Sequence, residues 1–144
     1  MRRRLALALL ALTLGSGIFQ TAGVSAQTPD EVRAFLTERA EAYGASVGVV
    51  LEIAACETGE RYTPFLIGSA GERGLAQWLP GRGNAWDQTP LYRAGVDIVS
   101  MYRAGHAEAW YADADMLAWA FSPQAPRGFG AHHWVYCSRR VGLR

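Results

Sequence analysis

Two neighbouring stretches of the chain decide the fold: ASVGVVLEIAACETG at residues 45–59 and GSAGERGLAQWLP at residues 68–80. The apolar side chains of the first stretch recur at helical spacing, at Val47, Val50, Leu51 and Ala54. That spacing favours a helix over residues 45–57, with Gly59 to end it, although a valine-rich segment could also form a buried strand. The second stretch is rich in glycine and predicts a loop with one short helix over residues 75–79.

An acid stands at the end of this apolar stripe. Glu57 lies three positions after Ala54 and points along the stripe, whereas Glu52 lies off it and is expected in solvent. A carboxyl group held against apolar side chains is costly to ionise, so we expect its pKa to rise from about 4.3 toward about 6. Such a group can act as a general acid at neutral pH. The alternative is that Glu57 caps a helix or pairs with an arginine such as Arg61 or Arg73.

The order of these residues resembles a catalytic signature. Glu57-Thr58-Gly59, followed by GERGLAQWLP from Gly71, is similar to the E-[ST]-x and G-x-x-G-L-x-Q elements of soluble lytic transglycosylases and goose-type lysozymes. Cys56 directly before the acid resembles the C-E-[ST]-G of resuscitation-promoting factors, a secreted branch of the same superfamily. The resemblance covers about residues 42–134. It implies a mainly helical, lysozyme-like small domain.

The resemblance also implies an activity, that of a peptidoglycan lytic transglycosylase. Glu57 would protonate the glycosidic oxygen between N-acetylmuramic acid and N-acetylglucosamine, and would then accept the proton of the muramoyl 6-hydroxyl, giving a 1,6-anhydro product. This chemistry needs no cofactor and no metal, and the partner is the peptidoglycan glycan strand. The residues expected to bind substrate are Ser69, Gly74, Gln77, Trp78 and Phe121. Trp86 is a further candidate for the cleft, and Trp119 is expected in the core.

This chain departs from the family's pattern at one element. The family's A-Y-N segment is matched here by Ala120-Phe121-Ser122, which lacks both the phenolic hydroxyl and the amide. Two alternatives therefore stay open. One is a muramidase that uses water, with Glu72 or Asp87 as a second acid; the other is a wall-binding protein without turnover.

The first 26 residues predict a secretory signal peptide, which leaves residues 27–144 as the lysozyme-like domain. Arg2-Arg3-Arg4 precedes an apolar run, and the segment ends with Val24-Ser25-Ala26. We therefore expect a secreted, extracytoplasmic protein with no membrane attachment after cleavage. In an exported chain, the two cysteines, Cys56 and Cys137, are expected to form a disulfide.

Charge and motifs exclude several other classes of function. The chain carries a net charge of +1, but three of its 14 basic residues lie in the signal segment, so residues 27–144 have 11 arginines against 13 acids. Nothing in this balance favours nucleic acid, and no pattern indicates an oligomer, so we expect a monomer. His132, His133 and Cys137 lack the spacing of a zinc site, and the glycine-rich loop lacks the GK[ST] ending of a phosphate-binding loop.

The rest of the chain predicts four more helices. The capping box Thr28-Pro29-Asp30-Glu31 begins a helix at about residue 29, which Gly44 ends. A helix is expected from Pro90 to Gly105, and another from an Asp113 cap to Phe121. A last short helix is expected over residues 131–139, after a break at residues 122–130.

Overall fold

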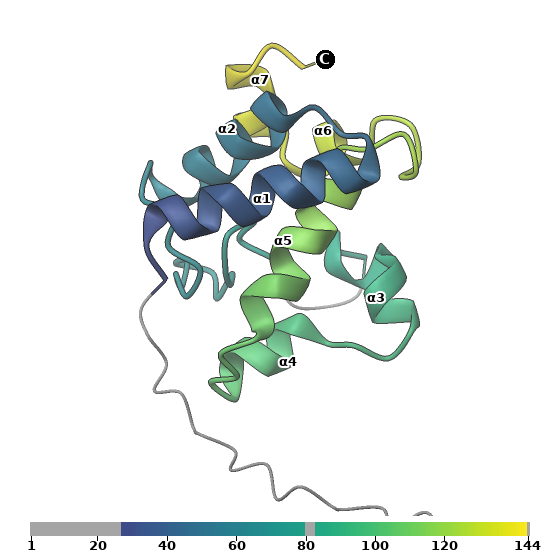
Figure 1. Cartoon of the computed structure of the whole chain (residues 1–144). Coiled ribbons are helices and arrows are strands. Elements are labelled where there is room, and N and C mark those ends of the chain that lie inside the picture. Colours follow the sequence, from purple (N-terminus) through teal and green to yellow (C-terminus); the bar gives the residue numbers. More distant parts are fainter. Residues whose placement is uncertain (1–26, 80–82, 144) are drawn as a thin grey trace, which may run out of the picture.

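The computed structural model describes residues 27–79 and 83–143, and its regular structure there is helical. Figure 1 shows two long helices, α1 and α2, lying side by side over a central helix, α5, with short helices around them. The element bounds are α1 Pro29–Tyr43, α2 Val47–Thr58, the 3-10 turn η1 Trp86–Gln88, α3 Pro90–Arg93, α4 Ile98–Arg103, α5 Ala109–Ala120, α6 Phe129–His133 and α7 Val135–Arg140.

The two long helices form where the sequence predicts them. The Thr28 hydroxyl accepts the Glu31 N–H, the Glu31 side chain accepts the Thr28 N–H, and Gly44 ends α1 in the left-handed conformation. Ser46 caps α2 through the Val49 N–H, and Gly59 (φ 62°) closes it. The valine-rich stretch is therefore helical, as its spacing indicates, and the strand alternative is wrong.

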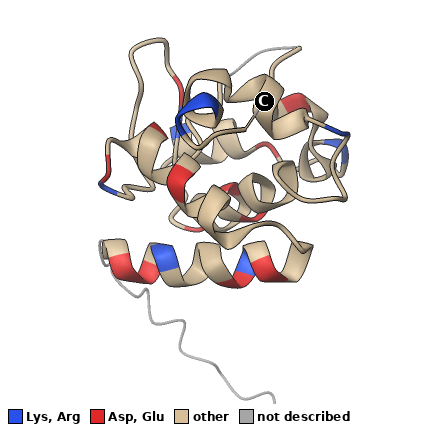
Figure 2. Cartoon of the chain, turned by 90° about the horizontal axis from the view of Figure 1, so that it is seen from above, with Lys and Arg blue, Asp and Glu red and all other residues tan. Residues whose placement is uncertain are grey.

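The core lies where α1 packs against α2 and α5. Leu36, Ile53 and Leu117, one from each of these helices, are fully buried. Trp119 is buried there as expected. In the view of Figure 2, acidic and basic residues are interspersed along α1, and residues of both signs occur in the segments around it. Within the described residues, no helix has the length and hydropathy needed to cross a membrane. The expected signal segment lies outside those residues.

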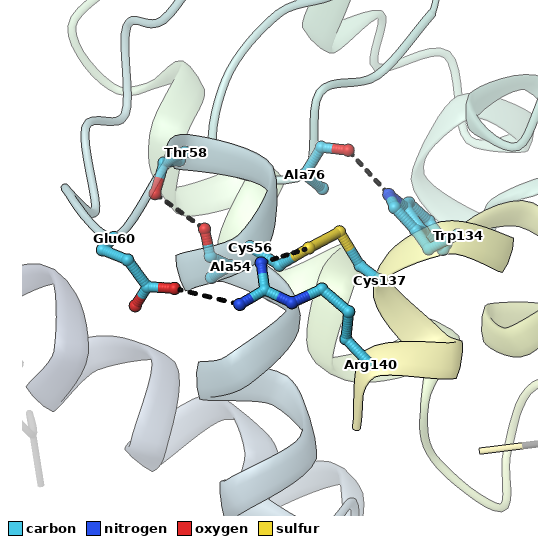
Figure 3. The surroundings of a disulfide bond; sticks show 8 residues. All are labelled: Ala54, Cys56, Thr58, Glu60, Ala76, Trp134, Cys137 and Arg140. Atoms are coloured by element: carbon cyan, nitrogen blue, oxygen red, sulfur yellow. Dashed lines mark hydrogen bonds and ion pairs between the residues drawn. A yellow bond between two sulfur atoms is a disulfide. The ribbon is translucent and has the colours of Figure 1, made fainter. Parts of the chain in front are cut away.

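A covalent link joins the helix of Glu57 to the C-terminal part of the domain. Cys56 and Cys137 form the expected disulfide, with their Cα atoms 5.8 Å apart. Figure 3 shows this bond connecting the last turn of α2 to α7. Disulfides persist in oxidising, extracytoplasmic environments, so the bond agrees with an exported protein. Glu57 directly follows Cys56, and Trp134 lies three residues before Cys137. The disulfide therefore holds the segment of Glu57 close to the segment of Trp134.

Three helix predictions in the shorter elements are wrong in detail. Residues 75–79 form no helix, because Gly74 (φ 83°) and Gln77 (φ 50°) adopt left-handed conformations that an α-helix does not contain. The helix expected from Pro90 to Gly105 is two helices, α3 and α4, separated at Gly95 (φ 91°). The last helix is also two, α6 and α7, with a break at Trp134.

Asp113 is the most informative correction. The sequence predicts that it caps a helix, but α5 begins four residues earlier, at Ala109, and the Asp113 side chain is 0% exposed. Its carboxylate accepts hydrogen bonds from another segment of the chain instead of from its own helix end.

Candidate active site

Glu57 lies in the last turn of α2, where the chain turns sharply away. The buried Thr58 hydroxyl donates to the Ala54 carbonyl at 2.7 Å and accepts the Tyr62 N–H at 2.9 Å. The Tyr62 hydroxyl donates back to the Leu51 carbonyl at 3.1 Å. These contacts hold the departing segment against α2, so the end of the helix that carries Glu57 is well anchored.

The glycine-rich stretch forms a compact double turn opposite this helix end, over residues 67–78. Arg73 pairs with both Ile67 and Trp78 in isolated bridges, and the two backbone hydrogen bonds between Arg73 and Trp78 are 3.0 and 2.8 Å long. Within the turn, the Gln77 side-chain amide donates to the Gly74 carbonyl at 2.7 Å. Gln77 is therefore fixed through its NH2 group, which leaves its side-chain oxygen as the acceptor.

Gly68 lies where this turn closes. A Cβ atom at Gly68 would overlap the Glu72 carboxylate and would lie 2.6 Å from the Gln77 side-chain oxygen. The Glu72 carboxylate also accepts the Ala70 N–H at 2.9 Å. The side chains of Glu72 and Gln77 thus meet over a backbone position that has room for no side chain of its own.

These elements line an open hollow of about 390 Å³. It is lined by Glu57, Gly68, Ser69, Glu72, Gln77, Leu79, His133 and Trp134. The acid from α2, the polar groups of the double turn and two residues at the junction of α6 and α7 therefore share one site. The disulfide Cys56–Cys137 connects the first of these walls to the third.

The environment of Glu57 makes its carboxyl group hard to ionise. Burial, and in second place the negative charge of Glu72, raise its pKa from the ordinary value of 4.5 to about 7. No described residue donates a hydrogen bond or forms an ion pair with Glu57, so Arg61 and Arg73 do not neutralise it. A carboxyl group of this kind is protonated in a large fraction of molecules near pH 7 and can donate its proton.

The expected substrate residues divide into two groups. Ser69 and Gln77 line the hollow with Glu57. Trp78 (1% exposed) and Gly74 are buried beneath the turn, and the cleft candidate Trp86 (3% exposed) is a core residue as well. The Trp78 indole N–H donates to Asp113 at 2.7 Å, so Trp78 supports the site from below and does not face a ligand.

Phe121 also lies away from the hollow. Its ring contacts Trp134, with centroids 5.7 Å apart, and it faces Gly130 of α6, where a Cβ would lie 2.5 Å from the ring. Phe121 lines a separate, mainly apolar hollow of about 620 Å³. Among the possible second acids, Glu72 lines the Glu57 hollow, whereas Asp87 does not and accepts the Gly83 N–H at 2.6 Å.

The structure adds three residues to the site: Leu79, His133 and Trp134. Burial, followed by the neighbouring His132, lowers the pKa of His133, so its ring is neutral at neutral pH and can both donate and accept a hydrogen bond. A signal for His133 and Trp134 does exist in the sequence. They precede Cys137 by three or four positions, and Cys137 is joined to the residue before Glu57.

The described residues contain no group of three or more potential metal ligands. Comparisons with protein-family models, with curated proteins and with solved structures found no match, so the functional argument rests on the residues of the site.

Proposed function

We propose that this protein is a secreted peptidoglycan lytic transglycosylase in which Glu57 is the catalytic acid and base. One observation carries the proposal. A carboxyl group with a pKa of about 7 opens into a hollow whose other walls offer neutral hydrogen-bonding groups, at Ser69, Gln77 and His133. Neutral donors and acceptors suit a sugar, and a pKa near the working pH suits a general acid.

The chemistry needs only one carboxyl group. Protonated Glu57 donates its proton to the bridging oxygen as the bond from C1 of N-acetylmuramic acid breaks, and the N-acetylglucosamine end leaves with a hydroxyl group. The muramoyl 6-hydroxyl then attacks C1 while its proton passes to the Glu57 carboxylate. The product carries a 1,6-anhydro bond, and Glu57 is again protonated. The burial that raises the pKa of Glu57 prepares it for the first step.

A second candidate, hydrolysis by a muramidase, is supported by one observation. Glu72 lines the same hollow, and its charge contributes to the raised pKa of Glu57. Inverting glycosidases have a second carboxylate in the site that activates the attacking water. In this mechanism Glu72 takes the proton of a water molecule that attacks C1, and the product has an ordinary reducing end. The version with Asp87 has no such support, because Asp87 lies outside the hollow.

The experiment is mass spectrometry of soluble fragments released from purified peptidoglycan by the oxidised mature protein. Transglycosylation gives muropeptides that are one water lighter than the hydrolysis products. We expect these from the wild type and not from Glu57→Gln, since loss of a general acid costs about 10²- to 10⁴-fold in rate. The matched control is Glu52→Gln, because Glu52 is an exposed acid of the same helix and lies outside the hollow.

Each other outcome would support a different function or mechanism. Reducing-end products from the wild type would favour the muramidase. A folded wild type that binds glycan strands and releases no fragments would favour the wall-binding alternative. Equal activity in Glu57→Gln and Glu52→Gln would remove Glu57 from the mechanism.

A further inference from the structure

Asp113 is a buried acid that the proposed chemistry does not use. It lies in α5, is 0% exposed and accepts four hydrogen bonds. The donors are Leu75 N–H at 2.5 Å, Ala76 N–H at 3.3 Å, the Trp78 indole N–H at 2.7 Å and the Tyr102 hydroxyl at 2.6 Å. Three of the four belong to the double turn, which lies 35–38 residues away in the sequence.

The donor set fits the ionised form of this carboxyl group. The Ala76 N–H and the Trp78 indole N–H reach Oδ1, and the Leu75 N–H reaches Oδ2. None of these groups can accept, so a proton on either carboxyl oxygen would compete with an N–H for that oxygen. Burial raises the pKa of Asp113 and the four hydrogen bonds lower it, and the balance lies at about 7. Burial and the neighbouring Asp113 raise the pKa of Tyr102 far above its ordinary value, which keeps its hydroxyl a donor.

The same turn carries one wall of the Glu57 hollow and supports another. Gln77 lies between Ala76, whose backbone N–H donates to Asp113, and Trp78, whose indole N–H donates to Asp113. The backbone of Gln77 is in the left-handed region (φ 50°). The Ala76 carbonyl accepts the Trp134 indole N–H at 2.7 Å (Figure 3). Asp113 therefore fixes the residues on either side of Gln77, and through Ala76 it reaches Trp134.

Gly74 shows how closely the carboxylate approaches this turn. A Cβ atom at Gly74 would overlap the Asp113 carboxylate and would lie 2.6 Å from the Tyr102 ring. The turn is thus pressed onto the carboxylate, with no space for a shift toward α5. We therefore expect a change in the hydrogen bonds of Asp113 to move the turn.

We propose that Asp113 is a positioning residue whose carboxylate sets the places of Gln77 and Trp134 in the walls of the Glu57 hollow. The effect on turnover rests on the function proposed above, whereas the effect on the geometry does not. Asp113 does not line the hollow, so it acts through the turn. A single buried carboxylate on α5 thereby aligns a polar wall from one segment with an aromatic wall from another.

The test is Asp113→Asn, followed by the indole N–H resonances in ¹H–¹⁵N spectra. Asparagine keeps the shape but offers one acceptor oxygen, and its NH2 group has to face at least one N–H of the turn. We expect the Trp78 indole resonance to move, because its partner changes. We also expect the Trp134 indole resonance to move, although Trp134 donates to Ala76 and not to Asp113. In turnover, we expect kcat to fall by about 10- to 100-fold, the range that small displacements of positioned groups produce.

The matched control is Asp115→Asn. Asp115 lies on the same helix and accepts hydrogen bonds from Arg39 at 2.6 Å and Tyr43 at 2.9 Å, so this variant also loses hydrogen bonds between elements without touching the turn. Its Trp134 resonance and its kcat should stay at the wild-type values. If Asp113→Asn fails to fold, Tyr102→Phe removes one donor and leaves the carboxylate, and it should shift both indole resonances by a smaller amount.

An unchanged Trp134 resonance in a folded Asp113→Asn variant would overturn the proposal. The same holds for the fallback: if Tyr102→Phe is the variant studied, unchanged indole resonances overturn it. A wild type that cleaves no glycan would refute the proposed activity, but the resonances would still decide whether Asp113 places the turn. An equal fall of kcat in Asp115→Asn and Asp113→Asn would show that lost stability, and not position, is the cause.

Discussion

Glu57 and Asp113 are two carboxyl groups for which burial raises the pKa to the same value, about 7, in opposite kinds of surroundings. Glu57 opens into a hollow, and no described residue donates a hydrogen bond to it. Asp113 is sealed in the core and accepts four hydrogen bonds, from the double turn and from Tyr102. The same pKa therefore marks a group that can give up a proton in one case and a group that holds structure in the other.

The difference lies in what can reach each oxygen. A buried carboxyl group without donors loses little when it is protonated, and an open hollow lets a substrate take the proton. A buried carboxylate with four donors loses at least one of those hydrogen bonds when it is protonated, and no ligand can approach it. A raised pKa alone does not identify a catalytic residue; the exposure of the group and its hydrogen-bond partners make the distinction.

The largest stability effect should come from adding a side chain at Gly74, next to the Asp113 carboxylate. Gly74→Ala would add a methyl group that overlaps the Asp113 carboxylate, at a backbone position with φ 83°. We expect a loss of about 3 kcal/mol or more in the free energy of unfolding, because strain and displacement of the carboxylate add together. Chemical denaturation followed by circular dichroism measures it.

The control for this prediction is Gly71→Ala in the same turn. Gly71 has φ 89°, but a Cβ there would meet nothing within 4 Å. It should cost only the backbone strain, about 1–2 kcal/mol. Equal losses in the two variants would contradict the close approach of Asp113 to Gly74.

The sequence predicts the position of Glu57 and misses the role of Asp113. Glu57 follows from local patterns, because an apolar stripe at helical spacing and a C-terminal glycine suffice to place it at the end of a helix. Asp113 invites the wrong interpretation, since an acid before an apolar helical run is typical of a cap. Its partners lie 35–38 residues away, and no periodicity records a contact of that kind.

The same limit explains the other misses. Trp78 directly follows Gln77 of the resembled motif, and its burial depends on the left-handed backbone of the turn and on its hydrogen bond to Asp113. By contrast, the capping box at Thr28 and the disulfide follow from rules that need only the nearest residues or the residue type, and both are confirmed.

The next prediction concerns the stability that Glu57 costs the protein. Its pKa is about 7 in the folded chain and 4.5 ordinarily, so the folded state retains a proton that the unfolded state releases between these values. The free energy of unfolding therefore falls as pH rises from about 4.5 to 7. Glu57→Gln removes this loss, so at pH 8 it should be more stable than the wild type, by about 1–2 kcal/mol after solvent screening.

Urea denaturation at pH 4 and pH 8 measures this effect. The two proteins should be close in stability at pH 4, where Glu57 is protonated in both the folded and the unfolded states. Asp113 titrates equally in both proteins, so its contribution cancels from the difference. A constant difference at the two pH values would show that the glutamine acts by packing and not by charge.

The smallest effect separates the two sources of the raised pKa of Glu57. Burial is the larger cause and the charge of Glu72 the smaller, so Glu72→Gln should lower the pKa of Glu57 while leaving it above 4.5. For the transglycosylase, the alkaline limb of the pH–rate profile should move to lower pH by less than about one unit, and the rate below the limb should stay the same. Glu60→Gln, an exposed acid just past the helix end, serves as the control.

If Glu72 instead activates water, the variant should lose about 10²-fold or more at every pH, because a general base is gone. A shifted limb with an unchanged plateau would thus assign Glu72 to the environment of Glu57, and a lowered plateau would make it the second carboxylate of a muramidase.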